Sequence, residues 1–508
     1  MTPDPDVMAS INPESRLPEE RARPDFRRFV AVDTETTGLD PDHGEIIEIG
    51  AARFVDGMEV DSFVTFIKPD RGLPERNRRL TGIDPSRLTD APSIATALEQ
   101  FRAFIGDDLL VLHNANFDLK FLAHYAARLG LSQLVNPALC TQHLAALIEP
   151  NAGTLQLGLL SEHWGITITD SHRALQDARS AGLLALRLIE ELRTWPPIFL
   201  SHLAGYRGKS VDPLFDLLEH LSGDPAVSSS DWRLDREIRS RLSTAQSDSI
   251  PGFPAIATYA KSEQDSQPDP VLRQEALEGL MRSGLSLIED LRPGSGHPID
   301  SILSGTLPVP RLVVGVLEED TVRRILGSSW DKDGISDILQ ACYLGRSSEY
   351  VCLRRAFDES GKPVGWIELS PFERVVLARW LASTWSGRVS RLSWWLLNNF
   401  TGLKGHLHSL CCSDFDCLGC QSSYDGPCFA EMALQRADKA SCVLVKQHYF
   451  FGAARCDVRT QSTLLPVPAC LIEQADQLVQ SGREARTEEL DLDSVVRRIK
   501  ALANDAAL

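Results

Sequence analysis

The sequence lacks several features that would place it in other classes of protein. It has no apolar run of transmembrane length, and no charged segment followed by an apolar run at its start, so we expect a cytoplasmic protein. It has no excess of basic residues, because 52 lysines and arginines face 70 aspartates and glutamates, for a formal net charge of −18. This charge argues against a broad basic surface that coats nucleic acid, but an enzyme that holds metal ions with carboxylates stays possible.

Cysteine is scarce, with 11 in 508 residues, yet five of them lie between Cys411 and Cys428. Cytoplasmic thiols stay reduced, which makes a disulfide knot a poor explanation of this cluster. Cys417-Xaa-Xaa-Cys420 is a common pair of metal ligands, but no matching second pair completes a zinc ribbon. Spacing alone leaves zinc, an iron–sulfur cluster, ordinary reduced cysteines and redox chemistry open.

Length and composition divide the chain into parts. The chain is too long for one core, so we expect roughly two or three domains. A segment rich in proline and charge opens the chain, and a stretch dense in Ser, Asp, Gln and Pro interrupts it near the middle. The expected parts are a disordered arm (1–25), an α/β domain (26–195), a helical connector and linker with a short helix at "LDREIRSRL" (196–270), and a second, mainly α/β domain (271–508).

The first α/β domain alternates strand-like and helix-like segments. Strands are expected at "RRFVAVDTETTGL", "EIIEIGAARFVDG", "EVDSFVTFIKP" and "DLLVLHN", with a tight turn at Asp56-Gly57. Helices are expected at "LTDAPSIATALEQFRAFIG", which ends near Gly106, at "FDLKFLAHYAARLG", and at "SHRALQDARSAGLLALRLIEEL", which starts at Ser171 or a near neighbour. In the second helix, Leu119, Leu122 and Leu129 are expected to share one face.

Four acidic residues and a histidine, spread over three segments, carry the strongest chemical signal. "VDTETTG" places Asp33 and Glu35 two apart on a strand, so both project from one face. "HNANFDLKF" places Asp118 where a strand gives way to a helix, and "HRALQDA" places His172 and Asp177 near the start of the long helix. Gathered carboxylates repel one another unless hard cations lie among them, and this ligand set suits Mg²⁺ or Mn²⁺. A pair of such ions can drive phosphodiester hydrolysis, and a histidine nearby can accept a proton near neutral pH.

These three segments resemble the motifs of the DEDDh family of 3′–5′ exonucleases, the DnaQ-like group, over roughly a third of the chain. The resemblance implies an RNase H-like fold with a mixed central sheet and two divalent ions. It implies that Asp33, Glu35, Asp118 and Asp177 bind the metals, and that His172 acts as the general base. It also implies that the 3′-terminal nucleotide is held by Thr36, Thr37, Leu80, Thr81, Gly82, Ile83 and Asn114.

Two C-terminal segments resemble those that bound the iron–sulfur domain of DinG-type helicases. They are "YLGRSSEYVCLRR", around Cys352, and "CFAEMALQRADKASCVLVKQHYFFGA", which begins at Cys428. The resemblance implies a [4Fe-4S] cluster, with zinc as the alternative. Its implied ligands lie within about 352–428 and are Cys352, Cys417, Cys420 and Cys428, with Cys412 as a competitor.

The same half lacks the residues that a helicase uses to bind ATP. In "LIEDLRPGSGHPID" the phosphate-binding lysine and hydroxyl residue are replaced by His297 and Pro298 or their neighbours. The metal-binding acidic box is replaced by "LIEQADQL". We therefore expect neither ATP binding nor unwinding, and a half that aids DNA binding.

Together these features predict a metal-dependent 3′–5′ exonuclease acting on DNA, at single-stranded or unpaired 3′ ends. An RNA exonuclease, or an exonuclease with a protein-interaction or redox-sensing C-terminal half, is the alternative. Arg76, Arg78 and Arg79 could contact phosphate or form a solvated basic loop. Trp394 and Trp395 could stack on bases, but adjacent tryptophans in an apolar helix are more typical of a core.

Overall fold

The computed structural model describes part of the chain in detail. The described residues are 23–167, 173–223, 232–244, 285–288, 312–316, 335–336, 341–412, 428–440, 442–446 and 469–473. Most of the expected disordered arm lies outside them. The chain divides into two compact units, and Leu369–Trp380 and Ser393–Phe400 belong to the first, together with Met1–Trp232. Within the described part, every helix is too short or too polar to cross a membrane.

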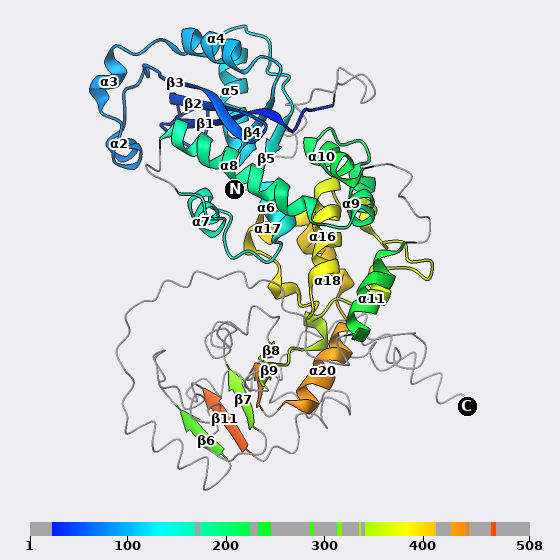
Figure 1. Ribbon diagram of the computed structural model, residues 1–508. Coiled ribbons are helices and arrows are strands. Elements are labelled where there is room, and N and C mark those ends of the chain that lie inside the picture. Colours follow the sequence, from blue (N-terminus) through cyan, green and yellow to red (C-terminus); the bar gives the residue numbers. More distant parts are fainter. Residues whose placement is uncertain are drawn as a thin grey trace. The chain divides into compact units, whose positions relative to one another are not determined.

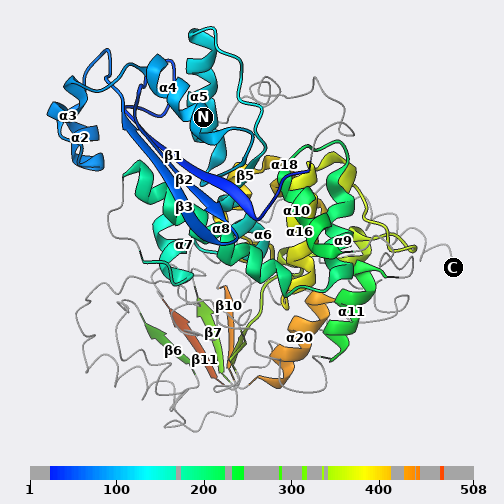
Figure 2. The ribbon, with the colours of Figure 1, turned by 45° about the horizontal axis from the view of Figure 1, so that its top comes forward.

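A five-stranded mixed sheet forms the centre of the first unit, in the order β3-β2-β1-β4-β5 (Figures 1 and 2). The strands are β1 (Arg28–Thr36), β2 (Ile46–Val55), β3 (Met58–Phe66), β4 (Leu109–Leu112) and β5 (Ala138–Cys140). The first three are antiparallel, whereas β4 and β5 run parallel to β1. This confirms the expected mixed α/β sheet. The tight turn at Asp56-Gly57 is also confirmed, since both residues have positive φ, 49° and 82°.

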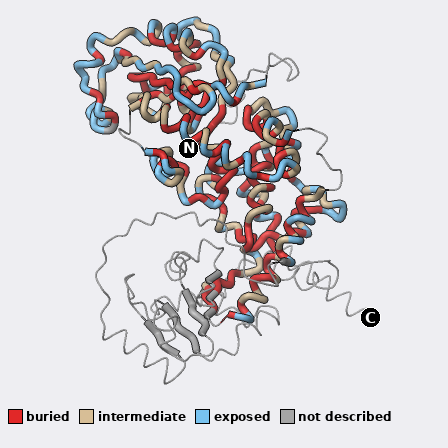
Figure 3. Tube along the Cα trace, viewed as in Figure 1, coloured by how far each residue is buried: buried red, intermediate tan, exposed pale blue. Residues whose placement is uncertain are grey.

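Helices cover both faces of this sheet. Helices α4 (Ile94–Ile105) and α5 (Ala115–Arg128) lie on one face, and α8 (Ala174–Arg193) lies on the other (Figure 1). The remaining helices of this part of the chain are α2 (Glu75–Thr81), α3 (Pro85–Thr89), α6 (Thr141–Ile148), α7 (Leu157–His163), α9 (Pro197–Ala204) and α10 (Pro213–Ser222). Val30 and Val32 pack with α4 and α5, whereas the alternate residue Ala31 lies beside Gly182 of α8. The sheet alternation therefore points Asp33, two residues after Ala31, towards the α8 face. Figure 3 shows the buried residues gathered along the strands and the inner sides of these helices.

The helix ends follow the sequence signals, with one exception. Ser93 caps α4 by accepting from Thr96 N, and α4 ends at Gly106 as expected. The expected apolar face of α5 was wrong in one position: α5 ends at Arg128, and Leu129 is 37% exposed. The buried side of α5 is instead made by residues at helical spacing, namely Phe121, Leu122 and Tyr125.

The second unit contains a six-stranded sheet in the order β6-β11-β7-β10-β9-β8. Its strands are β6 (Leu285–Ile288), β7 (Leu312–Val316), β8 (Ile335–Ser336), β9 (Ala341–Tyr343), β10 (Cys442–Lys446) and β11 (Ala469–Glu473). All paired neighbours are parallel except β8 and β9. Its helices include α11 (Leu234–Thr244), α15 (Leu353–Ala356), α18 (Thr401–Leu410) and α20 (Phe429–Lys439), and α11 confirms the helix expected at "LDREIRSRL".

Candidate active site

Three of the expected metal-binding carboxylates lie together at one end of the first sheet. Asp33 and Glu35 project from β1, and Asp177 lies in the first turn of α8. One carboxylate oxygen from each residue lies within 4.8 Å of the other two. Hard divalent cations favour such an all-oxygen donor set, so these side chains fit Mg²⁺ or Mn²⁺.

Asp118 belongs to the same region but is held differently. It lies in the first turn of α5 and is only 2% exposed. Its Oδ1 accepts hydrogen bonds from Thr34 N at 2.9 Å and from Thr34 Oγ1 at 2.7 Å. These bonds fix α5 against β1 between Asp33 and Glu35, and Asp118 is close enough to raise the pKa of Asp33 by charge repulsion.

The electrostatics of the site favour a bound cation. Burial, together with repulsion from Asp177 and Glu48, raises the pKa of Glu35 to about 8. Burial raises the pKa of Asp118 to about 7, although the Thr34 hydrogen bonds oppose the rise. Burial and the neighbouring carboxylates also raise the pKa of Asp33 well above its ordinary value. Positive charge would relieve this repulsion and bring the carboxylates back to their ionised forms.

The last residue of β1, Thr36, and the residue after it, Thr37, are fixed by hydrogen bonds, and both are expected to meet the substrate. Thr36 O accepts from Asn77 Nδ2 at 2.9 Å, and Thr36 Oγ1 donates to Gly38 O at 2.7 Å. Thr37 N donates to Glu45 O and Thr37 Oγ1 accepts from Glu45 N, both at 2.8 Å. The structure therefore holds Thr36 and Thr37 beside the carboxylates, and their contact with a nucleotide stays a prediction.

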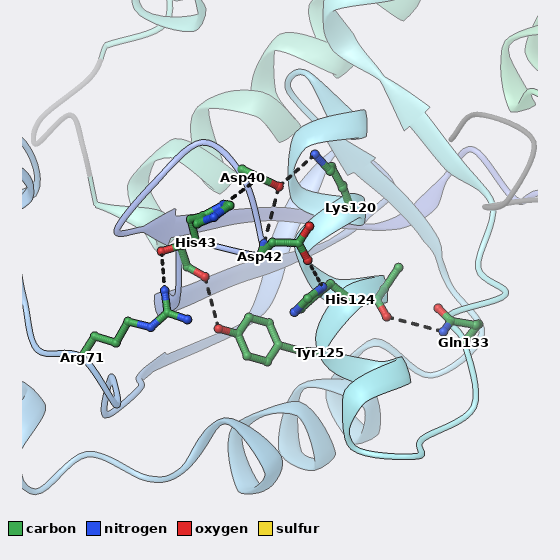
Figure 4. Close-up of polar contacts among 10 residues, drawn as sticks. Asp40, Asp42, His43, Arg71, Lys120, His124, Tyr125 and Gln133 are labelled. Carbon is green, nitrogen blue, oxygen red and sulfur yellow. Dashed lines mark hydrogen bonds and ion pairs between the residues drawn. The ribbon is translucent and has the colours of Figure 1, made fainter. Parts of the chain in front are cut away.

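The loop from Gly38 to Gly44, which follows this segment, contacts α5 through side-chain ion pairs (Figure 4). Asp40 pairs with His43 at 3.1 Å and with Lys120 of α5 at 3.5 Å. Asp42 pairs with His124 of α5 at 3.5 Å. Because these contacts join the loop to the helix that carries Asp118, the two sides of the site are linked by more than the sheet.

The expected nucleotide-binding residues on α2 and beyond are partly internal. Thr81 is buried and its Oγ1 donates to Asn77 O at 2.9 Å, while Gly82 ends α2 with φ of 64°. Ile83 packs in a small buried cluster with Ile47 and Leu88. Leu80 lies in α2, but its side chain lies outside the described residues. The role of this segment stays a prediction.

Two further expected residues precede the helices of the site. Asn114 immediately precedes α5 and has a left-handed backbone, with φ of 59°, which asparagine tolerates better than most residues. His172 and Ser171 lie outside the described residues, and α8 begins after Arg173. The general-base role of His172 therefore stays a prediction.

Sequence reasoning missed Glu48, a fully buried carboxylate on β2 beside the site. It pairs with Glu35 in the β1–β2 register and is 0% exposed. Its two oxygens accept from the Arg173 guanidinium at 2.9 and 3.2 Å, and one is 3.4 Å from Ala174 N. A charged residue between two buried isoleucines in "EIIEIG" was the available signal. Glu48 positions the start of α8, and so Asp177.

The segment with Arg76, Arg78 and Arg79, expected as a basic loop, forms helix α2, and the side chains of these arginines are exposed. Its Arg78 and Arg79 pair with Glu75 at 3.4 and 3.1 Å. Such pairs between exposed side chains fit a solvated surface, and contact of this helix with phosphate stays a prediction.

Of the cysteines expected to bind a metal, the structure describes Cys352, Cys412 and Cys428, all in the second unit. The segments around Val351 and Cys411 form a short antiparallel pair, with Cys352 N donating to Leu410 O and Cys412 N to Tyr350 O. A hydrogen bond with the Cys412 thiol lowers the pKa of Cys352 to about 6. Cys428 caps α20 by accepting from Glu431 N at 3.4 Å. Cys417 and Cys420 lie outside the described residues, so the expected metal site of these cysteines stays a prediction.

Comparison with known proteins identifies the first unit. A family model described as "Exonuclease" matches residues 30–184. The DNA polymerase III subunit epsilon of Aquifex aeolicus is 34% identical over 164 residues, which are 32% of this chain and 81% of that subunit. The chain belongs to this exonuclease family. The resemblance seen in the sequence is thus confirmed for the DnaQ-like exonuclease domain.

Other relatives share the same region. The PolC-type DNA polymerase III of Oceanobacillus iheyensis is 37% identical over 164 residues, but the match spans only 12% of that longer protein. Among solved structures, exonuclease X in complex with 5′-overhanging duplex DNA is 24% identical and covers 32% of this chain and 92% of its own. The TM-score of this match is 0.28.

Proposed function

We propose that this chain is a divalent-metal-dependent exonuclease that removes nucleotides from the 3′ end of DNA, at single-stranded or unpaired ends. The observation that carries the proposal is the convergence of Asp33, Glu35 and Asp177, with Asp118 buried beside them. Membership of the exonuclease family supports hydrolysis of nucleic acid by this site.

The residues of the site would divide the reaction among them. Asp33, Glu35, Asp118 and Asp177 would hold two Mg²⁺ or Mn²⁺ ions, which supply activation of water and stabilisation of the leaving oxygen when bound. His172, two residues before the first residue of α8, would accept the proton of the attacking water. Thr36 and Thr37, fixed by Asn77 and Glu45, would orient the terminal nucleotide.

For the second unit, we propose a helicase-like lobe that has lost ATP binding and aids binding of the nucleic-acid strand. Its mainly parallel six-stranded sheet is compatible with such a lobe. An iron–sulfur cluster on the cysteines is part of this proposal. A lobe that instead captures a protein partner or senses redox state would leave strand affinity unchanged when its surface is altered.

The test is cleavage of end-labelled DNA and RNA strands by the full chain and by Asp33→Ala, with Mn²⁺ and with a chelator. We expect nucleoside monophosphates released from the 3′ end, and no cleavage by the variant or in the chelator. Glu99→Ala, at an exposed position on α4, is the control and should cleave normally. Cleavage by Asp33→Ala would refute the metal assignment, whereas faster release from RNA would favour an RNA exonuclease.

A further inference from the structure

Helix α6 supports both helices that carry carboxylates of the active site. Thr141, its first residue, is fully buried, and its Oγ1 donates to Leu112 O at 3.3 Å and lies 2.9 Å from His113 Nδ1. His113 directly precedes Asn114 and the start of α5, which carries Asp118. Helix α6 also packs against α8, which carries Asp177. A shift of α6 would therefore displace α5 and α8, and with them Asp118 and Asp177 of the metal-binding site.

The other side of α6 is covered by residues from far along the chain. The ring of His143 stacks on Phe372 of α16 (Pro371–Ser383), with centroids 4.3 Å apart and planes inclined by 25°. Trp395 of α17 (Trp394–Asn399) and the adjacent Phe400 lie 6.3 and 6.0 Å from the same ring. Phe400 also packs on Phe372 at 5.0 Å and on Trp395 at 5.6 Å, so the aromatic side chains form one connected cluster.

The C-terminal end of α6 is held by the same two segments. Arg379 donates to the carbonyl of Ile148, the last residue of α6, across 231 positions of sequence. Its guanidinium also lies 4.3 Å over the ring of Trp195. Ser393 N donates to Pro150 O at 2.8 Å. Arg379 thus brings a cation to a carbonyl that the end of α6 leaves unpaired, and Ser393 fixes the chain just beyond the helix.

We infer that Leu369–Trp380 and Ser393–Phe400, which we call the distal segments, are a positioning element of the exonuclease site. Helix α6 has only 8 residues, a length at which tertiary contacts rather than helix propensity supply the stability. The distal segments provide those contacts at its middle and at its end. The C-terminal half of the chain thus completes the first unit, and metal binding at Asp33, Glu35 and Asp177 depends on it.

This inference rests on the proposed function for its activity readout, but it also makes a prediction about metal affinity alone. It further implies that removing everything after residue 223 deletes part of the first unit. Loss of cleavage by such a fragment would therefore say nothing about strand binding by the second unit.

The test compares two adjacent tryptophans of α17 in the full chain. Trp395 packs in the aromatic cluster, whereas Trp394 is 76% exposed and serves as the matched control. We expect Trp395→Ala and Phe372→Ala to weaken Mn²⁺ binding, measured by calorimetry, by about tenfold, which is the lower end of effects seen for residues that support ligands. We also expect faster hydrogen exchange in residues 141–148. Trp394→Ala should match the unaltered protein, and Trp395→Phe should restore most of the affinity.

Several outcomes separate the possibilities. If Trp395→Ala and Phe372→Ala stay folded and bind Mn²⁺ as tightly as Trp394→Ala, the inference is wrong. If Trp395→Ala fails to fold, Arg379→Met gives the same comparison with less loss of packing, and wild-type Mn²⁺ affinity in this variant would overturn the inference. If the unaltered protein binds Mn²⁺ but cleaves nothing, the proposed function fails, while the affinity comparison still decides the role of the distal segments.

Discussion

The ion pair between Arg173 and Glu48 permits a prediction in which two losses partly cancel. Glu48 is fully buried, whereas the Arg173 side chain is 33% exposed. Arg173→Ala would leave a buried negative charge without its ionic partner, beside Asp33 and Glu35, which already repel it. Glu48→Gln would instead leave a cation that can turn to water, and it would remove a charge from a crowded region.

The magnitudes follow from this asymmetry. Breaking a buried ion pair from one side costs about 3–5 kcal/mol, and the partial exposure of Arg173 reduces our expectation to about 2–3 kcal/mol. Glu48→Gln should cost about 1 kcal/mol, the value of a neutral hydrogen bond. Combining both substitutions should restore roughly half of the stability lost in Arg173→Ala, because the buried charge is gone.

The assay is thermal and urea unfolding of the metal-free chain and of the three variants at pH 7. We expect Arg173→Ala to lower the melting temperature by roughly 5–10 °C, with the double variant melting between it and Glu48→Gln. A double variant that is no more stable than Arg173→Ala would refute the claim that an uncompensated charge on Glu48 is the cause.

Three further predictions concern other parts of the site and chain. The pKa of Glu35 in the folded state, about 8, lies above its ordinary value of 4.5. Between these two values the folded state retains a proton that the unfolded state releases. The resulting contribution to stability is complete below about pH 4.5 and is lost as the pH rises through 8. The metal-free protein should therefore melt lower at pH 8 than at pH 6, and Glu35→Gln should flatten this dependence; equal slopes would contradict the assignment. Gly50→Ala should destabilise the first unit and impair cleavage, because a Cβ there would lie 2.2 Å from the backbone of Ala174 and Leu175. The matched control Gly158→Ala, in α7 with open space around the new Cβ, should not lower the melting temperature in the same assay. Anaerobically purified protein with an iron–sulfur cluster should contain about four irons and four sulfides per chain, lost in Cys428→Ser, whereas zinc or no metal by elemental analysis would exclude that cluster.

Local sequence was sufficient to predict the elements that carry the catalytic motif. Alternation along β1 put Asp33 and Glu35 on one face, and helical spacing and capping residues gave α4 and most of α5. These features depend on neighbours within a few residues, so strand and helix periodicity specify them. Family motifs then related Asp33 and Glu35 to Asp177, although the segments lie far apart in the chain.

Tertiary structure alone decided the features that depend on distant contacts. Glu48 became part of the site because β2 meets the start of α8, a proximity that no local pattern encodes. Trp394 and Trp395 are identical neighbours in sequence, but Trp394 is exposed, against the expectation of a core position, whereas Trp395 is half-buried and packs in the aromatic cluster. Adjacent positions of a helix point in different directions, and which of them is buried depends on where α6 and Phe372 lie.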